Sequence, residues 1–456
     1  MLAAICSGVL MTIVDSTSVI VALPSMETGL GFSDSSLAWV VNAYLVAYSG
    51  FLLVSGRLGD LIGHGRLFLW GVVLFTVTSL ACALADSWEE LLAARALQGL
   101  AGAMDVTASL SVIVNTFEDP AERAQALGIH GFATSGGGIL ALLLSGALTS
   151  LLGWRWIFLI NVPLGVIIVA FCIVMLPNLG RHATRQPLDL GGAITITSSL
   201  TVVVYAVANA DAAGWASART LGLLLGATLL FVLFTAIEAR SRAPLIPLGL
   251  FRIGNLAACC IASSLFAAAG SAGIFVSLYL QSVLGYSPLQ AGVTFLPYSL
   301  LTAVISLGLS ARIVIRFGVR MPLAVGLTVA AAGFVFFMRT PVRGHVFVDV
   351  LPGLVLLALG NSVAFNPMWI AGMSSVPRSQ SGLVSGVIYT SSAMGGALGL
   401  AAFASASASH TRKLLAAGVG SAAALNDGYH SAFLMGSLSA AGAAVIALAF
   451  FNAQKS

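Results

Sequence analysis

The sequence predicts an all-α integral membrane protein, and three observations lead to this class. Hydrophobic residues make up 59% of the 456 residues, before the 49 glycines are counted, and charged residues make up 8%. An ordinary soluble domain has about 25% charged residues and could not cover its surface with so few. The mean hydropathy of +1.02 agrees. The apolar residues also fall into stretches of about 20, the length that crosses a bilayer as a helix.

Fourteen such stretches lie between charged, Pro and Gly residues, and we expect each to be a transmembrane helix. They are 2–23, 36–56, 67–86, 90–115, 122–150, 156–176, 189–209, 218–238, 255–280, 288–312, 320–339, 346–372, 380–405 and 430–451. The first is expected to be a retained helix, because it lacks the positive start of a signal peptide and Asp15 interrupts it.

The distribution of basic residues predicts the orientation. With a cytoplasmic N-terminus, 13 of the 20 Lys and Arg residues fall in cytoplasmic loops and 6 fall outside, while Arg95 lies within a span. Positive residues gather on the cytoplasmic side of membrane proteins, so this bias supports an even number of spans. We therefore expect a multi-pass protein of the cell membrane with both termini in the cytoplasm.

Two parts of the chain resemble each other, which indicates an internal repeat. In "GRLGDLIG" (56–63) and "ARIVIRFG" (311–318), Arg57 aligns with Arg312 and Gly63 with Gly318. This fits two six-helix bundles with two helices inserted between them. The predicted domains are residues 1–177 (spans 1–6), 178–242 (spans 7–8 with flanking loops) and 243–456 (spans 9–14).

Polar residues on span four point to a buried site. In "RALQGLAGAMD" (95–105), Arg95, Gln98, Gly102 and Asp105 are spaced i, i+3, i+7 and i+10. On an α-helix they stay within a sector of roughly 80°. A stripe of this kind must face protein or water, not lipid. A snorkelling Arg95 is the alternative for the first of them, but it does not explain Asp105.

Asp15 and Asp105 are the acids that we assign to the interior of spans. A carboxylate in the middle of a membrane helix costs about 2.5–3.5 kcal/mol on insertion scales, so it marks a functional site by default. The alternative is a neutral, hydrogen-bonded structural Asp at either position.

A short charged turn, "GRLGDLIGHGR" (56–66), supplies Gly56, Asp60, Gly63 and Arg66, and Asp60 and Arg66 are placed to pair or to cap neighbouring helices. Its alternative is a generic cytoplasmic turn.

Taken together, these motifs resemble the fourteen-span drug:proton antiporter family of the major facilitator superfamily. The similarity is carried by "VDSTSVIVALP" (14–24), "GRLGDLIGHGR", "LLAARALQGLAGA" (91–103), "WRWIFLINVPLG" (154–165), "PLIPLGLFR" (244–252), "LYLQSVLGYSPLQAGVTFLP" (278–297) and "GLVSGVIYTSSAMGGALGLA" (382–401). The resemblance implies a major facilitator fold and alternating access. It also implies proton coupling through Asp15 and Arg95, and a cytoplasmic latch of Asp60 with Arg66. Asp105 is an addition to the family's fourth-span motif, and we expect a second protonation site or a part in selectivity there.

The sequence departs from the family pattern at two places. Leu61 and Gly65 occupy positions that are usually basic in the loop motif, and His64 replaces an Arg. In the Gly-rich fifth span the antiporter motif would have Gly-Pro where Ala141 and Leu142 stand. The missing Pro removes the usual kink, so a proton-coupled symporter or facilitator of the same fold for a small metabolite remains the alternative to export.

Substrate-cavity candidates are chosen by polarity, or by aromatic and Met character, together with span position. They are Asn42, Gln98, Gln281, Asn361, Asn366, Trp369, Tyr389 and Met394. Asn366 precedes Pro367, where we expect a broken helix whose freed carbonyls face a cavity.

Other function classes are disfavoured. The six histidines are scattered, and neither G-x-S-x-G nor H-E-x-x-H occurs, so an enzyme is not expected. The five cysteines lack metal-ligand spacing and are read as small buried hydrophobes. We expect no metal and no cofactor, with the proton gradient as the energy source. The expected partners are protons, a hydrophobic or amphipathic small molecule and membrane lipid, but no nucleic acid, and the chain is expected to act as a monomer.

Overall fold

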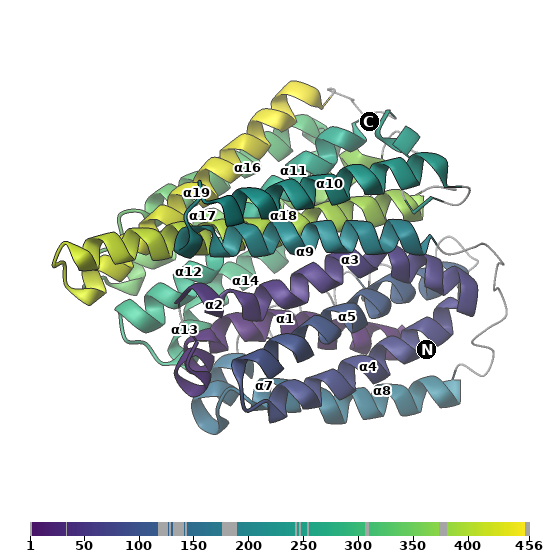
Figure 1. Ribbon diagram of the computed structural model, residues 1–456, viewed down its shortest axis with the longest axis horizontal. Coiled ribbons are helices and arrows are strands. Elements are labelled where there is room, and N and C mark those ends of the chain that lie inside the picture. The colour runs from purple at the N-terminus through teal and green to yellow at the C-terminus, as the bar shows by residue number, and fades with distance from the viewer. Residues whose placement is uncertain are drawn as a thin grey trace. The chain divides into compact units, whose positions relative to one another are not determined.

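A computed structural model describes residues 2–32, 34–116, 126, 129–130, 141, 144–175, 189–241, 244–245, 248–252, 255–305, 310–373 and 381–451. Within these ranges the regular structure is entirely helical (Figure 1). Eleven of the described helices are long and apolar enough to cross a membrane, and Trp39–Leu52 is a shorter apolar helix. The all-helical prediction is therefore confirmed. Most of the predicted span 122–150 lies outside the described residues, and the count of fourteen stays a prediction.

The chain divides into two compact units. Unit 1 comprises Met1–Thr201 and Leu230–Leu245, and unit 2 comprises Val202–Leu229 and Ile246–Ser456. The two helices of the predicted insertion, α9 (Leu190–Ala213) and α10 (Ala218–Arg240), each contribute to both units. The predicted domain boundaries at 177/178 and 242/243 stay a prediction.

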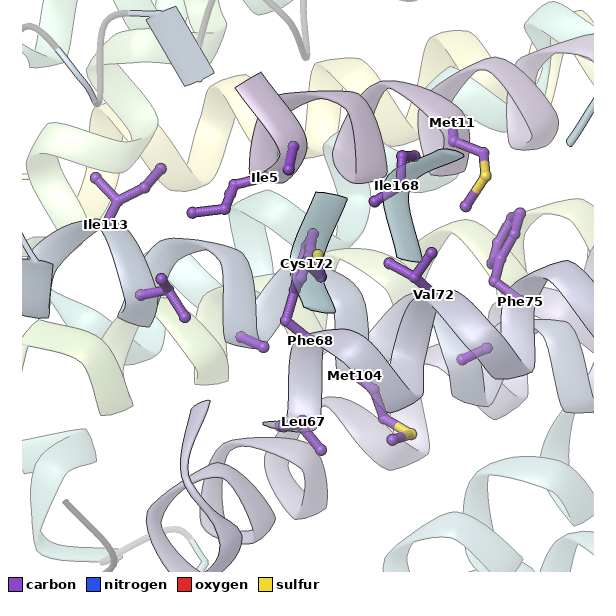
Figure 2. Close-up of a cluster of buried hydrophobic side chains, with 14 of the residues drawn as sticks. Ile5, Met11, Leu67, Phe68, Val72, Phe75, Met104, Ile113, Ile168 and Cys172 are labelled. Carbon is purple, nitrogen blue, oxygen red and sulfur yellow. The ribbon is translucent and has the colours of Figure 1, made fainter. Parts of the chain in front are cut away.

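Unit 1 is built mainly from helices of the first six predicted spans. They are α1 (Leu2–Leu30), α2 (Asp34–Leu37), α3 (Trp39–Ile62), α4 (His64–Leu84), α5 (Trp88–Thr116), α7 (Trp156–Leu159) and α8 (Asn161–Met175). Helix α5 packs against both α3 and α4, and α1 contacts α5 and α8. Figure 2 shows the buried cluster between these helices, with Ile5 and Met11 of α1 facing Phe68 and Val72 of α4.

Unit 2 contains the remaining helices. They are η1 (Leu248–Arg252), α11 (Leu256–Ser271), α12 (Gly273–Leu278), η2 (Tyr279–Val283), α13 (Pro288–Thr294), α14 (Leu296–Val304), α15 (Ser310–Phe317), α16 (Arg320–Phe337), η4 (Val346–Val350), α17 (Leu351–Met373), α18 (Ser381–Ala416) and α19 (Ser421–Phe450). Helix α18 packs against α11 and α19, and α16 packs against α17 and α19.

Several predicted helix ends are wrong, and at three prolines the helices differ from the prediction. Helix α1 continues past Pro24 to Leu30, and α17 continues past Pro367 to Met373, so the expected break at Pro367 is absent. A proline inside a helix removes one backbone hydrogen bond, and a membrane helix can tolerate that loss when neighbouring groups compensate. The predicted span 288–312 is divided instead, because α13 ends before Leu296–Pro297 and α14 starts there.

Helices α18 and α19 are longer than their predicted spans. Most of residues 406–429 was predicted as a loop, but α18 ends at Ala416 and α19 begins at Ser421. Apolarity locates the part of a helix inside the bilayer and does not register the turns that project beyond it.

The two glycines aligned in the predicted repeat both have positive φ and the same backbone hydrogen bond. Gly63 joins α3 to α4 with φ of 91°, and Gly318 ends α15 with φ of 72°. In both, the N–H donates to the carbonyl four residues earlier, at 2.9 Å for Gly63 to Gly59 and 2.8 Å for Gly318 to Val314. Positive φ favours glycine, so this turn geometry explains why both positions hold one.

Candidate functional site

The polar residues of span four are presented by α5. Ser87 precedes this helix, and its hydroxyl accepts a hydrogen bond from the Glu90 N–H at 3.3 Å, while the Glu90 carboxylate accepts from the Asp86 N–H at 3.0 Å. This is close to a capping box, which satisfies free N–H groups at a helix start. Further along the helix, Arg95, Gln98 and Asp105 are all buried. The predicted stripe therefore faces protein.

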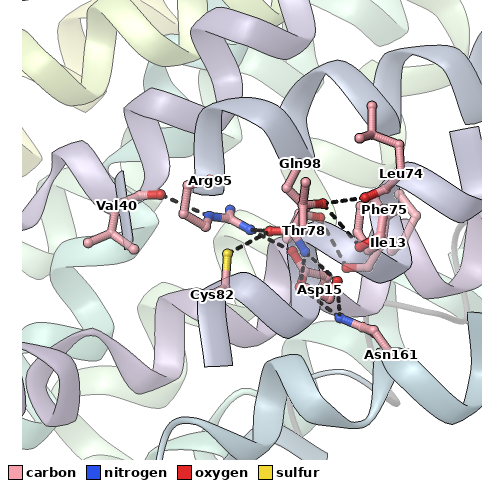
Figure 3. A network of polar contacts seen from close by, with 12 residues as sticks. Ile13, Asp15, Val40, Leu74, Phe75, Thr78, Cys82, Arg95, Gln98 and Asn161 are labelled. Carbon is pink, nitrogen blue, oxygen red and sulfur yellow. Dashed lines mark hydrogen bonds and ion pairs between the residues drawn. The ribbon is translucent and has the colours of Figure 1, made fainter. Parts of the chain in front are cut away.

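Asp15 of α1 and Arg95 of α5 form a buried ion pair (Figure 3). The Arg95 Nη1 lies 2.6 Å from the Asp15 Oδ2, and each residue is 1% exposed. Two opposite charges in contact offset each other's desolvation only when hydrogen bonds satisfy their remaining polar atoms. The sequence alone placed these residues 80 positions apart, and the structure brings them together.

Amide groups complete the surroundings of the Asp15 carboxylate. Its Oδ1 accepts from the Gln98 Nε2 at 3.0 Å and from the Asn161 Nδ2 of α8 at 2.9 Å. Gln98 also accepts from the Arg95 Nη1 at 2.6 Å and donates to the Ser79 hydroxyl of α4 at 2.8 Å. The network thus joins α1, α4, α5 and α8 around one carboxylate.

The Arg95 guanidinium has further partners beyond the carboxylate. Its Nε donates to the Val40 carbonyl of α3 at 3.1 Å. Its central carbon lies 4.5 Å from the ring centroid of Tyr44 and 5.8 Å from that of Phe158. Cation–π contacts of this kind strengthen when they are shielded from water. The guanidinium is therefore held by hydrogen bonds at its edge and by rings at its face, and snorkelling of Arg95 is excluded.

Asp105 lies in a different environment from Asp15. Its Oδ2 accepts one hydrogen bond, from the Thr12 hydroxyl of α1, at 2.9 Å. Among the described residues its Oδ1 has no hydrogen-bond partner, and no basic side chain lies within 4.0 Å of its carboxylate. The side chain is 0% exposed. Two buried acids on the same helix pair therefore have contrasting partners.

The remaining candidates of unit 1 are also placed by the structure. Asn42 of α3 is 0% exposed, and neither polar atom of its side chain has a hydrogen-bond partner among the described residues. Gly102 packs beside Tyr44, where an added Cβ would lie 2.6 Å from the phenolic oxygen. In the loop motif, Gly56 lies in α3, Gly63 makes the turn and Arg66 is exposed. The side chain of Asp60 lies outside the described part, so its pairing with Arg66 stays a prediction.

Three of the cavity candidates in unit 2, all half-buried, lie on α17 and α18. The rings of Trp369 and Tyr389 lie 4.3 Å apart between centroids, and Phe365 lies 6.2 Å from Trp369. Asn361 donates to the Tyr298 hydroxyl of α14 at 3.1 Å. These residues form an aromatic cluster with polar edges.

The other unit 2 candidates lie on η2, α17 and α18. Gln281 lies in η2 and donates to the Ser277 hydroxyl at 3.0 Å, one turn earlier on its own helix. Met394 is buried in α18, and Asn366 is half-buried in α17. Among the described residues, no group of three His, Cys, Asp or Glu side chains could hold a metal ion.

Sequence reasoning missed several members of these networks. Asn161 and Ser79 contact the Asp15 group, and Thr12 contacts Asp105. Ser79 and Thr12 are single small polar residues in apolar stretches, which gives no specific signal, whereas Asn161 lies within the motif at 154–165. A further buried acid, Glu238 of α10, is 3% exposed and accepts from the Leu245 N–H at 3.2 Å. Asp15 and Asp105 are therefore not alone among buried acids of the spans.

Comparison with known proteins gives relatives over nearly the whole chain. The cephamycin export protein CmcT of Amycolatopsis lactamdurans is 34% identical over 439 residues, which are 94% of this chain and 87% of that protein. The puromycin resistance protein pur8 of Streptomyces alboniger is 34% identical over 435 residues, 94% of this chain and 85% of that protein. The tetracenomycin C resistance and export protein of Streptomyces glaucescens is 33% identical over 403 residues, 88% and 74% of the two chains.

Solved structures share the fold at lower identity. A peptide transporter POT in complex with sulfate matches with a TM-score of 0.71 and 16% identity, covering 98% of this chain and 93% of that one. A D-xylose-proton symporter matches with a TM-score of 0.67 and 13% identity, covering 99% and 97%. The model of the Major Facilitator Superfamily matches residues 5–400. The resemblance seen in the motifs is thereby confirmed, and the chain belongs to the major facilitator superfamily.

Proposed function

We propose that this chain is a proton-coupled secondary transporter that exports hydrophobic or amphipathic small molecules by alternating access. The observation that carries the proposal is the buried Asp15–Arg95 ion pair with its amide partners, inside a chain of this superfamily. The relatives named for cephamycin export, puromycin resistance and tetracenomycin C export support an antibiotic, or a molecule like one, as the substrate.

Proton coupling requires a group whose proton occupancy changes the stability of a helix contact. Asp15 and Asp105 are carboxyl groups that meet this requirement where α1 packs against α5, and Arg95 takes part as the fixed positive charge that Asp15 neutralises. Neutralising one member of a buried ion pair leaves the other charge without a partner, at a cost of about 3–5 kcal/mol. A change of that size is enough to shift a two-state equilibrium from one side to the other.

The substrate would be recognised by polar side-chain atoms that are free to form hydrogen bonds and by the faces of aromatic rings. Asn42 has both side-chain polar atoms unpartnered among the described residues, and the Trp369 indole Nε1 has no partner there either. The Trp369 and Tyr389 rings would stack on an aromatic drug, and Asn361 would offer hydrogen bonds. Gln98, Gln281, Asn366 and Met394 complete the proposed set of substrate-cavity residues.

We place the protein in the cell membrane as a monomer of fourteen helices, with residues 1–177 and 243–456 as six-helix bundles and 178–242 as the insertion. Both termini would be cytoplasmic, supported by the bias of basic residues. The turn with Gly56, Asp60, Gly63 and Arg66 would act as the cytoplasmic latch. The positive φ of Gly63 supports a tight connection there.

A symporter or facilitator of the same fold is the second candidate. It is favoured by Ala141, which stands where the antiporter motif has glycine. The Ala141 carbonyl accepts from the Ser18 hydroxyl of α1 at 3.3 Å, and the Ser145 hydroxyl donates to the Ser18 carbonyl at 2.6 Å. These contacts join α1 to the described part of the fifth span.

The deciding experiment combines resistance with transport. Cells that lack their own exporters would express the wild type, Asp15→Asn or Asp86→Asn, and would be challenged with puromycin, ethidium and a quaternary ammonium biocide. Asp86 is the matched control because its carboxylate is 93% exposed. We expect resistance from the wild type and Asp86→Asn and its loss in Asp15→Asn at equal expression. Ethidium efflux that continues unchanged after the proton gradient is collapsed would rule out antiport.

A further inference from the structure

The two acids shared by α1 and α5 have environments that call for different charges. Asp15 has a cation at 2.6 Å and two amide donors. Asp105 has one hydroxyl donor and, among the described residues, no cation within 4.0 Å. A carboxylate removed from water without a cation costs several kcal/mol, whereas a neutral carboxyl group does not incur that cost.

Asp105 lies beside the buried hydrophobic cluster of unit 1, and among the described residues it forms no ion pair. The cluster includes Phe68 of α4, Met104 of α5 and Ile168 of α8, several of which Figure 2 shows. Its titratable members are Tyr44 of α3 and Cys172 of α8, both neutral in their ordinary state, and Tyr48 of α3 packs against it. On the α1 side, Thr12 contacts Asp105, and Asp15, one turn further on, is already paired with Arg95. No described residue of the cluster therefore neutralises a charge on Asp105.

Two glycines bring the backbones of α1 and α4 close to Asp105. An added Cβ at Gly8 would lie 2.9 Å from the Asp105 Oδ1 and 2.8 Å from Phe68, and one at Gly71 would lie 3.0 Å from the Asp105 backbone nitrogen. The glycines create the room that the carboxyl occupies. A proton adds almost no volume to a carboxyl group and therefore fits this site.

Thr12 can serve Asp105 with and without a proton. Its single hydroxyl hydrogen lies within reach of two acceptors, the Asp105 Oδ2 at 2.9 Å and the Gly8 carbonyl at 3.2 Å. When Asp105 is ionised, Thr12 donates to it. When Asp105 is protonated, its O–H donates to the Thr12 oxygen, and Thr12 donates to Gly8 instead. Both states keep a hydrogen bond, so the proton moves without disrupting the helix pair.

We propose that Asp105 binds the transported proton inside unit 1, while Asp15 remains the counter-ion that fixes Arg95. This inference rests on the proposed proton-coupled function and divides its roles between the two acids. Thr12 and Asp15 are three residues apart on α1, so a change at Asp105 is transmitted to the ion pair through one turn of helix. Asp105 acts as the switch and Asp15 as the anchor.

A further polar pair, Ser109 and His130, lies beyond Asp105, on the side away from Asp15 along α5. Ser109 follows Asp105 by one turn, is 0% exposed, and its hydroxyl lies 3.3 Å from the His130 Nε2. At 100° per residue, Ser109 falls within the sector already occupied by Arg95, Gln98 and Asp105. The pair lies on the side of Asp105 toward the C-terminal end of α5, where a proton that leaves Asp105 would next meet a titratable group.

The test uses purified full-length protein in proteoliposomes, with ethidium as the probe. Three quantities are measured: ethidium exchange without a gradient, its acceleration by an imposed pH gradient, and the infrared C=O band of a protonated carboxyl as pH is varied. Asp105→Asn can still donate to Thr12, so it should keep exchange and lose the acceleration and the titrating band. Asp15→Asn leaves Arg95 unpaired, so it should lose exchange but keep the band.

Two outcomes would overturn the assignment: a titrating band that survives in Asp105→Asn and is lost in Asp15→Asn, or no titrating band in the wild type. The proposed function is tested separately: it is wrong if a pH gradient does not accelerate ethidium transport by the wild type, whatever the infrared result. Thr12→Ser should behave as the wild type, whereas Thr12→Val should reduce the acceleration with exchange retained. Equal gradient responses of Thr12→Ser and Thr12→Val would contradict the part given to this hydroxyl.

Discussion

The guanidinium carbon of Arg95 lies 4.5 Å from the ring centroid of Tyr44, so an aromatic face covers the cation whose edge binds Asp15. Tyr44 is 3% exposed and its ring also stacks on Tyr48 at 5.7 Å. The ion pair is thus built against a ring system of α3 as well as across α1 and α5.

Replacing Tyr44 tests the aromatic cover of the cation. Tyr44→Leu removes the π face and should lower the free energy of unfolding by about 2 kcal/mol beyond the loss of apolar contact. Tyr44→Phe keeps the face and should stay close to the wild type. The measurement is the unfolding midpoint of detergent-solubilised protein for both variants. Equal midpoints for Leu and Phe would show that the ring serves packing alone.

A double-mutant cycle tests the Asp15–Arg95 pair. Asp15→Asn and Arg95→Gln should each destabilise the protein by about 3–5 kcal/mol, because each leaves a buried charge unpaired. The double variant carries neither charge and should be less destabilised than the sum of the two. Thermal unfolding of all four proteins supplies the coupling energy. Strict additivity would mean that the two side chains do not interact.

Gly8 should tolerate no side chain. The Cβ of Gly8→Ala would meet the Asp105 Oδ1 at 2.9 Å and Phe68 at 2.8 Å, so we expect a loss of about 1–3 kcal/mol and weakened transport. Gly222→Ala in α10 is the matched control, since no atom lies within 4 Å of its added Cβ. This control should be neutral or stabilising, because alanine favours a helix over glycine. The measurement is the unfolding midpoint of each variant compared with the wild type, and equal midpoints for Gly8→Ala and Gly222→Ala would contradict the prediction.

The aromatic cluster of unit 2 should affect the choice of substrate more than folding. Trp369→Ala removes the ring that lies 4.3 Å from Tyr389, and a lost stacking contact of about 0.5–1.5 kcal/mol corresponds to a change of roughly 2–10-fold in affinity for an aromatic dye. Trp70→Ala, on the 59% exposed Trp70 of α4, is the control and should change neither binding nor resistance. Fluorescence titration with ethidium measures the difference.

The sequence predicted the fold class and the inward face of α5, but not the Asp15–Arg95 pair. Apolar length alone predicted the helices, because a chain in lipid must satisfy its backbone within the helix. The spacing of Arg95, Gln98 and Asp105 on α5 correctly predicted an inward stripe. The resemblance implied a role for both Asp15 and Arg95 in proton coupling, but only the structure pairs them, since no local pattern links residues 80 positions apart.

The sequence did not predict which residues of α4 and α8 contact the Asp15 group. Asn161 and Ser79 are single polar residues on α8 and α4, and their depth and rotation decide whether they meet Asp15. Helix ends were missed for a related reason. Pro24 and Pro367 read as breaks, but packing keeps α1 and α17 helical through both. Tertiary contacts therefore override the local signal at the sites that matter most.

The five cysteines have a practical consequence for watching this protein move. Cys6, Cys82, Cys172, Cys259 and Cys260 are all free and buried, as the sequence indicated. Thiols without solvent access react slowly with maleimides. A new cysteine at an exposed position, such as Leu151 at 77% or Phe347 at 81%, would therefore take up a fluorophore or spin label selectively in the native background. Distance measurements between such labels can then follow opening and closing without first stripping the chain of its own thiols.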